Sequence, residues 1–191
     1  LLHNQLRKCL EVMLEILQMN ELKVTGCECR LKVADVSGVI DMTLEDKNRH
    51  PVVFDFKWTT WPKGYQEKLT QNRSIQLEYY RWMLQCDQKD EVKRVAYFIM
   101  PDAKLYSKEA FQGKNCIQFN PENDDNIVEQ LRQSILYRKE QIASGIIETN
   151  GVYEDLQYVK DTIEKGLFSL NKNDEGTKEG NFFTQYGLFN K

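Results

Sequence analysis

Two carboxylates and one ammonium group interrupt a stretch of the sequence that is otherwise apolar. Asp41, Asp55 and Lys57 lie within GVIDMTLEDKNRHPVVFDFKWTT, residues 38–60. If this stretch forms an antiparallel hairpin with its turn near Asn48, residues whose numbers sum to about 96 face each other, and Asp41 lies opposite Asp55. Lys57 follows Asp55 by two residues and therefore points to the same face. The spacing predicts that the three charges converge.

The alternate positions of the same hairpin are apolar and predict a surface that a helix covers. They are Ile40, Met42, Leu44, Val52, Phe54, Phe56 and Trp58. A slip of the register by one residue would send both acids into the core, so the alternation favours this pairing.

A divalent cation would explain why two acids are placed together. Two carboxylates repel each other by about 4 kcal/mol at roughly 4 Å with an effective dielectric constant of about 20. Hard ions such as Mg²⁺ bind carboxylate, carbonyl and water oxygens, and they relieve this repulsion. Lys57 would then orient a nucleophilic water or neutralise charge that develops on phosphorus. The alternative is a structural ion pair on an exposed sheet face, and spacing alone leaves both open.

Length and composition limit the class of protein. The chain has 191 residues, 41% of them hydrophobic, which is enough for one sizeable core and favours a single domain over residues 1–191. The sequence has no apolar run long enough to cross a membrane and no signal peptide, so we expect a soluble, cytoplasmic protein. Because the first residue is Leu1, we also expect this to be the C-terminal part of a longer protein.

Cysteine and charge patterns give weaker signals. Five cysteines, odd in number and irregularly spaced, favour reduced thiols over a disulfide framework. Cys27 and Cys29 form a C-x-C pair, which an alternating strand would place on one face for structural reasons. The formal net charge of −3 shows no overall basic footprint for nucleic acid. Residues 57–81 carry five Lys or Arg against two Glu, which a solvated helix face would also explain.

Hydrophobic periodicity predicts the elements that hold these residues. Helices are expected over 2–18 and 75–85, and strands over 23–33, 36–44, 51–58 and 92–100. Beyond Pro101 the pattern predicts a turn near 111–115, helices around 124–144 and 154–166, a polar tail and a final aromatic segment at 182–189. We therefore expect a core over about 20–100 and a helical extension over about 120–170.

Three motifs in this order resemble those of the PD-(D/E)XK nuclease superfamily, in particular its RecB-like branch with the AddB-type and RecB-type nuclease domains. GVID at 38–41 is similar to the G-x-x-D motif of that branch, DFK at 55–57 to its D-x-K motif, and QLEYY at 76–80 to its Q-x-x-x-Y motif. The resemblance implies an α/β restriction-endonuclease-like core, with a central mixed β-sheet flanked by helices.

The resemblance also implies roles at the hairpin. Asp41 and Asp55 would ligate Mg²⁺ or Mn²⁺, and the backbone carbonyl of Phe56 would complete the shell of the ion. Lys57 would assist the attacking water. No cysteine follows Cys116, so the iron–sulfur cluster of some RecB-like nucleases is not expected.

Four further residues are similar to positions that carry function in that branch. Glu28 and His3 would be additional metal ligands, although an exposed strand glutamate and a surface or core histidine are the alternatives. Gln76 and Tyr80 lie four residues apart on one helix face and would support catalysis or contact DNA. Their alternatives are a surface amide and a half-buried core tyrosine.

The activity implied is metal-dependent hydrolysis of DNA by an exonuclease of repair or recombination, with a helicase module as partner. Basic side chains would hold the phosphate backbone of a single or double strand near its end, and an exposed indole would stack on an unpaired base. These are Lys63, Lys68, Arg73, Arg81 and Trp61. The alternatives are an inactive nuclease fold that binds DNA or a protein, and a metal-dependent enzyme with a non-nucleic substrate.

Overall fold

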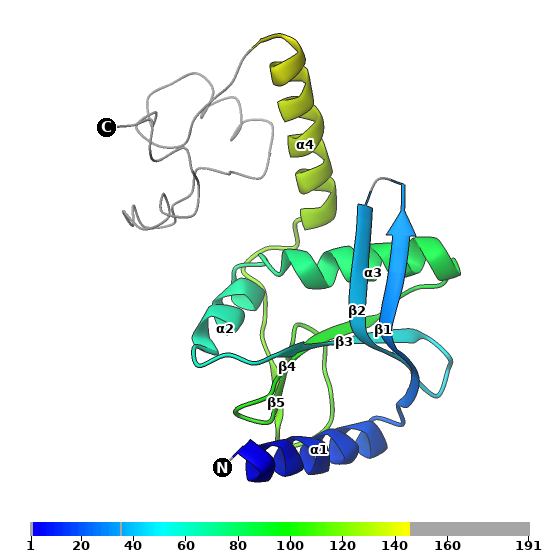
Figure 1. Ribbon diagram of the computed structural model, residues 1–191, viewed down its shortest axis with the longest axis vertical. Coiled ribbons are helices and arrows are strands. Elements are labelled where there is room, and N and C mark those ends of the chain that lie inside the picture. The colour runs from blue at the N-terminus through cyan, green and yellow to red at the C-terminus, as the bar shows by residue number, and fades with distance from the viewer. Residues whose placement is uncertain (1, 35, 146–191) are drawn as a thin grey trace. The chain divides into compact units, whose positions relative to one another are not determined.

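The computed structural model describes residues 2–34 and 36–145. The chain divides into two compact units, Leu1–Asp125 and Asn126–Lys191. The prediction of one domain over residues 1–191 stays a prediction. The elements of the first unit are α1 (Leu2–Met19), β1 (Lys23–Val33), β2 (Val36–Glu45), β3 (Pro51–Lys57), α2 (Lys63–Thr70), α3 (Ile75–Gln88), β4 (Arg94–Ile99), β5 (Lys104–Ser107) and β6 (Cys116–Gln118); α4 (Ile127–Ala143) begins the second unit (Figure 1).

The strands of the first unit form one mixed sheet in the order β1-β2-β3-β4-β5-β6. β1, β2 and β3 are antiparallel neighbours, whereas β3 and β4 are parallel. A parallel pair needs a crossover connection, and α2 and α3 lie in that connection. The expectation of an α/β restriction-endonuclease-like core, with a mixed sheet flanked by helices, is confirmed.

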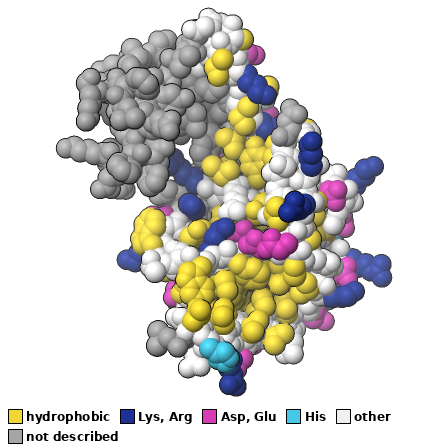
Figure 2. Space-filling view, viewed as in Figure 1, with side chains coloured by type: hydrophobic (Ala, Val, Ile, Leu, Met, Phe, Trp, Pro, Cys, Tyr) yellow, Lys and Arg dark blue, Asp and Glu magenta, His cyan; other side chains and the backbone are white. Residues whose placement is uncertain are grey.

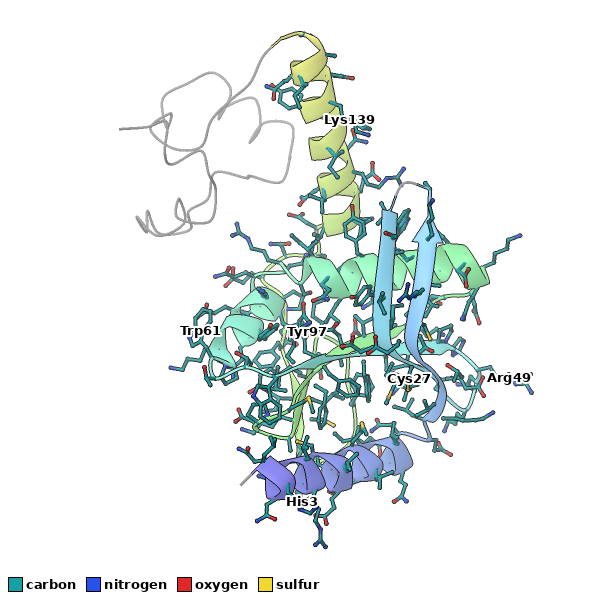
Figure 3. All side chains as sticks on the ribbon, in the orientation of Figure 1. His3, Cys27, Arg49, Trp61, Tyr97 and Lys139 are labelled. Atoms are coloured by element: carbon teal, nitrogen blue, oxygen red, sulfur yellow. The ribbon has the colours of Figure 1, made fainter. Side chains whose placement is uncertain are left out.

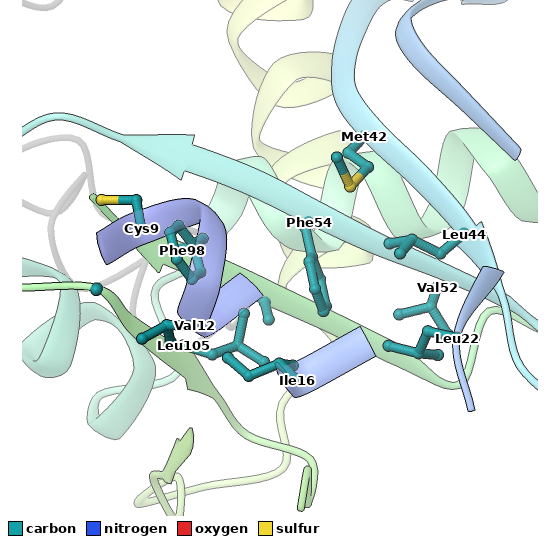
Figure 4. Packing of buried hydrophobic residues seen from close by; sticks show 12 residues of the cluster. Cys9, Val12, Ile16, Leu22, Met42, Leu44, Val52, Phe54, Phe98 and Leu105 are labelled. Atoms are coloured by element: carbon teal, nitrogen blue, oxygen red, sulfur yellow. The ribbon is translucent and has the colours of Figure 1, made fainter. Parts of the chain in front are cut away.

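Helices cover both faces of the sheet. On one face, α1 buries Cys9, Val12 and Ile16 against a cluster that includes Phe54 and Phe98 (Figure 4). The apolar residues of α1 recur at helical spacing, so one side of the helix packs against the strands. Full burial of a side chain such as Phe54 contributes roughly 1.5–3 kcal/mol.

The opposite face holds a second cluster, to which α2 contributes Leu69 and α3 contributes Leu77 and Leu84. Val53 of β3 packs here, while its neighbour Phe54 packs on the α1 side. Successive side chains of a strand alternate between faces, so Asp55 and Lys57 lie on the same face as Val53. The two candidate catalytic side chains of β3 therefore face α2 and α3.

The β1–β2 hairpin changes face part-way along its length. Met42 packs in the cluster of α1, but Ile40 packs in the cluster of α3, so the prediction that both line one apolar surface is wrong. Between these positions, Glu28 of β1 has a φ of 52°, a left-handed conformation that interrupts the alternation of a strand. Cys27 is exposed beside Met42, whereas Cys29 packs against the α3 cluster, so these cysteines do not share a face either.

Trp58 also departs from the predicted apolar surface. β3 ends at Lys57, and the side chain of Trp58 is 52% exposed. The alternation that would bury Trp58 holds only while the strand continues.

The periodicity located the longer elements and missed the short ones. The predicted helices and strands up to residue 100 and the helix around 124–144 are present, while α2, β5 and β6 were not predicted. The predicted helix at 154–166 and the aromatic segment at 182–189 lie outside the described residues. None of the helices within residues 2–34 and 36–145 combines the length and apolar character needed to span a membrane.

Candidate active site

The turn between β2 and β3 determines which residues face each other. A carboxylate oxygen of Asp46 accepts hydrogen bonds from the backbone N–H groups of Asn48 and His50, at 2.9 and 3.0 Å. The strands then pair Met42 with Phe54, which confirms the register predicted from the sequence. Continued by one residue, this register brings the two acids of the hairpin to the same level.

Asp41 lies at the end of this ladder, and its side chain, not its backbone, accepts the hydrogen bond from β3. Its Oδ2 accepts a hydrogen bond of 2.7 Å from the backbone N–H of Phe56 on β3. Phe56 directly follows Asp55, so the bond holds the carboxylate of Asp41 near that of Asp55. The negative charge of Asp41 is one of the influences that raise the pKa of Asp55.

Asp55 is the most buried acid of the site, with 1% of its surface exposed. Its Oδ2 lies 2.5 Å from Nζ of Lys57. Neither carboxylate oxygen accepts a hydrogen bond of good geometry within the described part of the chain. Burial raises the pKa of Asp55 most, Lys57 opposes the rise and Asp41 adds to it. The environment therefore disfavours the ionised carboxylate unless more positive charge is supplied.

These residues fit a divalent cation. The buried Oδ1 of Asp55 has no protein partner within residues 2–34 and 36–145, and carboxylate oxygens are the donors that Mg²⁺ and Mn²⁺ prefer. The same described residues contain no group of three His, Cys, Asp or Glu side chains placed to hold a metal ion. Two protein carboxylates are nevertheless sufficient for Mg²⁺, which typically keeps several waters and also binds substrate phosphate.

A cavity of about 390 Å³ lies beside the acidic pair. Gln76 and Tyr80 of α3 line it, and Nε2 of Gln76 donates a hydrogen bond of 3.0 Å to Oη of Tyr80. Tyr97 of β4 lines it as well and pairs with Asp55 across the parallel strands. Nζ of Lys57 lies 5.9 Å from the centre of the Tyr97 ring. Asp41, Asp55 and Lys57 are not among the described residues that line the cavity, and Tyr97 connects it to Asp55 and Lys57.

Comparison with known proteins agrees with this geometry. Residues 1–154 match the PD-(D/E)XK nuclease superfamily. The chain belongs to this superfamily. Its members are nucleases that generally depend on a divalent metal, and the described acids and lysine carry the residue types of the superfamily name. No curated protein matches the chain.

Two of the metal ligands predicted for this PD-(D/E)XK chain are not brought to the acidic pair. Glu28 is exposed on β1, at the position where the strand bends. His3 is exposed on α1, which covers the face of the sheet opposite to Asp55 (Figure 3). Neither residue joins Asp41 and Asp55 in a metal-binding group of the described residues. The assignment of Glu28 and His3 as metal ligands stays a prediction.

The predicted DNA-binding residues fall into two groups. Lys63 and Lys68 are exposed on α2, and Arg73 lines the cavity. Trp61, 61% exposed, lies in the loop before α2 and lies over Gly64 so closely that a Cβ there would be 2.3 Å from the indole (Figure 3). Acidic and basic side chains lie close together near the middle of the face shown in Figure 2.

Arg81 forms the second group, because its charge is already paired within the protein. Its guanidinium is 20% exposed and contacts the carboxylates of Glu78 and Glu109. It also donates hydrogen bonds to the backbone carbonyls of Val92 and Lys93, at 2.8 and 3.2 Å. These contacts tie α3 to the start of β4, so Arg81 has a structural role.

Tyr97 was missed because only the strand pairing places it at the site. In the sequence it is one aromatic residue of a buried strand. In the structure, burial raises the pKa of Tyr97 most, and the nearby charge of Asp55 adds to the rise. Tyr79 was missed although it lies between Gln76 and Tyr80 in the motif and lines the same cavity. Tyr79 follows Gln76 by three residues, and this spacing could have predicted that both lie on one helix face.

Proposed function

We propose that the chain is a Mg²⁺- or Mn²⁺-dependent deoxyribonuclease of the RecB-like branch. The observation that carries this proposal is the buried carboxylate of Asp55, which lies beside Asp41 and Lys57 and whose Oδ1 has no donor among the described residues. An acid with only a structural role is normally satisfied by donors of the protein itself. Oδ2 of Asp55 contacts Lys57, but Oδ1 has no partner among the described residues and would bind the cation.

Asp41 and Asp55 would hold the cation, with the carbonyl of Phe56 as a further oxygen ligand. When bound, the cation would polarise the scissile phosphate and lower the pKa of an attacking water. Lys57 contributes a positive charge on the same face. Its ammonium group would donate a hydrogen bond to the attacking water and orient it. The N–H of Phe56 keeps Asp41 in position while these contacts form.

Gln76 and Tyr80 would contact the substrate strand next to the acids. The hydrogen bond between them leaves the amide oxygen of Gln76 available as an acceptor. Lys63, Lys68 and Arg73 would neutralise backbone phosphates, a contribution that weakens as salt rises. Trp61, exposed in the loop after β3, would stack on an unpaired base.

We further propose that the enzyme acts as an exonuclease in DNA repair or recombination, in the cytoplasm and together with a helicase module. The three motifs of the RecB-like branch support this assignment. The five cysteines are free thiols, which fits a reducing compartment.

The decisive experiment compares the native chain with Asp55→Ala on linear and circular DNA, single- and double-stranded, in Mg²⁺, Mn²⁺ or EDTA. We expect cleavage that requires a metal, is lost in Asp55→Ala, and is faster on linear than on circular DNA. A native chain that binds DNA and metal but cuts none of these substrates would contradict the nuclease proposal and favour a binding scaffold.

A further inference from the structure

The cavity beside the acids has a wall that metal-dependent hydrolysis does not require. Gln76, Tyr79, Tyr80 and Met83 occupy positions i, i+3, i+4 and i+7 of α3, so they form one face of this helix. The wall carries aromatic rings, a thioether and one amide, which together offer apolar surface and few polar groups. Such a surface suits a flat, partly polar ring more than a phosphate.

The other wall is the outer half of the β1–β2 hairpin, which crosses α3 (Figure 1). Gly38 stands here with no side chain. A Cβ at this position would lie 3.3 Å from Cε1 of Tyr80 and 3.4 Å from Sδ of Met83. A larger residue would therefore fill the space between hairpin and helix, so the glycine keeps the cavity open.

The size and the charges of the cavity limit what it can hold. Its volume of about 390 Å³ lies near the lower end of the range for small-molecule sites and is suited to one nucleotide. A base must leave its helical stack to enter a pocket of this kind. Lys68 and Arg73 line the same cavity, so two positively charged side chains border the place of that nucleotide's phosphate.

We propose that this cavity binds one unpaired nucleotide of the DNA strand, next to the phosphate that is cut. Its base lies against Tyr79 and Tyr80, its edge meets the amide of Gln76, and its phosphate is directed toward Lys68 and Arg73. This inference rests on the proposed nuclease function, because it names the form of DNA that the same site accepts. The enzyme therefore prefers single strands or frayed ends to paired duplex.

The test compares four affinities, those of the native chain and of a Tyr79 variant for a strand with bases and for a strand without them. In EDTA, where no strand is cut, the native 191-residue chain and Tyr79→Ala are each titrated with a labelled single-stranded oligonucleotide. The same titration uses an abasic oligonucleotide with the same number of phosphates. We expect the native chain to bind the base-bearing strand about tenfold more tightly than the abasic strand, and Tyr79→Ala to lose most of this preference.

Two further variants separate stacking from folding. Tyr79→Phe keeps the ring and should keep the preference for bases. Tyr79→Leu keeps apolar bulk in a good helix former but has no ring, so it should lose the preference even where Tyr79→Ala does not fold. The inference is overturned if the native chain does not prefer bases, or if Tyr79→Leu retains the full preference.

The outcome is independent of catalysis. A preference for bases in EDTA combined with no cleavage in Mg²⁺ or Mn²⁺ supports the nucleotide site and contradicts the proposed activity. Metal-dependent cleavage without any preference for bases supports the nuclease and overturns the nucleotide site. Affinity for blunt duplex should be equal in the native chain and Tyr79→Phe. If Tyr79→Leu loses as much affinity for blunt duplex as it loses for single strands, the inference is also overturned.

Discussion

Asp46 and Asp55 belong to the same β2–β3 hairpin, yet their environments are opposite. Burial disfavours the charge of Asp46, but hydrogen bonds from the backbone N–H groups of His50 and Asn48 outweigh this and lower its pKa. Burial raises the pKa of Asp55 most, Asp41 adds to the rise, and Lys57 opposes it without reversing it. One acid is satisfied by its own chain and holds the turn. The other is buried beside Lys57, and we propose that a cation binds it.

A lysine near each acid, Lys57 beside Asp55 and Lys47 next to Asp46, offers the strongest test of this difference. Lys57→Ala should reduce cleavage by about 10²- to 10⁴-fold, because the group that orients the water is lost. Lys47→Ala removes the exposed ion pair with Glu21 near the turn and should leave cleavage unchanged. Initial rates in Mg²⁺ measure both. If Lys57→Ala unfolds, as judged by circular dichroism, Lys57 is a structural residue and its assigned role is wrong.

Replacement of each acid by asparagine should change stability in opposite directions in EDTA. Asp46→Asn weakens charge-assisted hydrogen bonds and should cost about 1 kcal/mol, whereas Asp55→Asn removes a poorly satisfied buried charge and should raise the melting temperature. Mg²⁺ should stabilise the native chain and Asp46→Asn but not Asp55→Asn. Thermal unfolding with and without Mg²⁺ measures this, and equal metal effects in both variants would remove Asp55 from the metal site.

The pH dependence of stability in EDTA should also differ in sign. The folded-state pKa of Asp55 is raised, so its contribution is present below the unfolded pKa of about 3.9 and is lost as pH rises through the folded pKa. The folded-state pKa of Asp46 is lowered, so its contribution is present above the unfolded pKa and is lost as pH falls through the folded pKa.

Urea unfolding of the native chain and the two asparagine variants across this range measures each contribution, at about 1.4 kcal/mol for each unit of pKa difference. The advantage of the native chain over Asp46→Asn should grow with pH. The stability of the native chain relative to Asp55→Asn should fall as the pH rises. Two curves with the same sign would mean that the two carboxylates do not differ as described.

Arginines of the two regions should differ in their effect on DNA. Arg73→Ala should weaken DNA binding and reduce the slope of affinity against salt by about one, as expected for the loss of one phosphate contact. Arg49 lies exposed in the hairpin turn with a φ of 66°, so Arg49→Asn is the control that tolerates this conformation. Titrations at several salt concentrations measure the slope, and equal slopes for both variants would take Arg73 out of the DNA path.

The smallest effect concerns two tyrosine hydroxyls, that of Tyr80 in the cavity and that of Tyr106 in the core. Tyr80→Phe loses the hydrogen bond from Gln76 and should lower turnover by roughly twofold to tenfold with little effect on folding. Tyr106→Phe loses a buried partner of Gln66 and should lower stability by about 1 kcal/mol while turnover is retained. Should Tyr80→Phe melt the domain instead, Tyr80 belongs to the core.

Much of the site could be predicted because it is local in the sequence. Asp41, Asp55 and Lys57 lie on two strands joined by a short turn, so the turn was sufficient to predict the register that pairs Met42 with Phe54 next to the two acids. Gln76 and Tyr80 lie one helical turn apart, and helix geometry alone put them on one face. In both cases the spacing of residue types within a few positions determines the arrangement.

The tertiary structure decided the remaining features, because each depends on segments far apart in the chain. Tyr97 neighbours Asp55 only through the parallel pairing of β3 and β4, whose register no local turn determines. Arg81 became structural through contacts with Glu109 and the start of β4. The left-handed backbone at Glu28, where the hairpin changes face, followed no alternation in the sequence. The sequence by itself therefore determined which charges meet, whereas long-range packing decided what surrounds them.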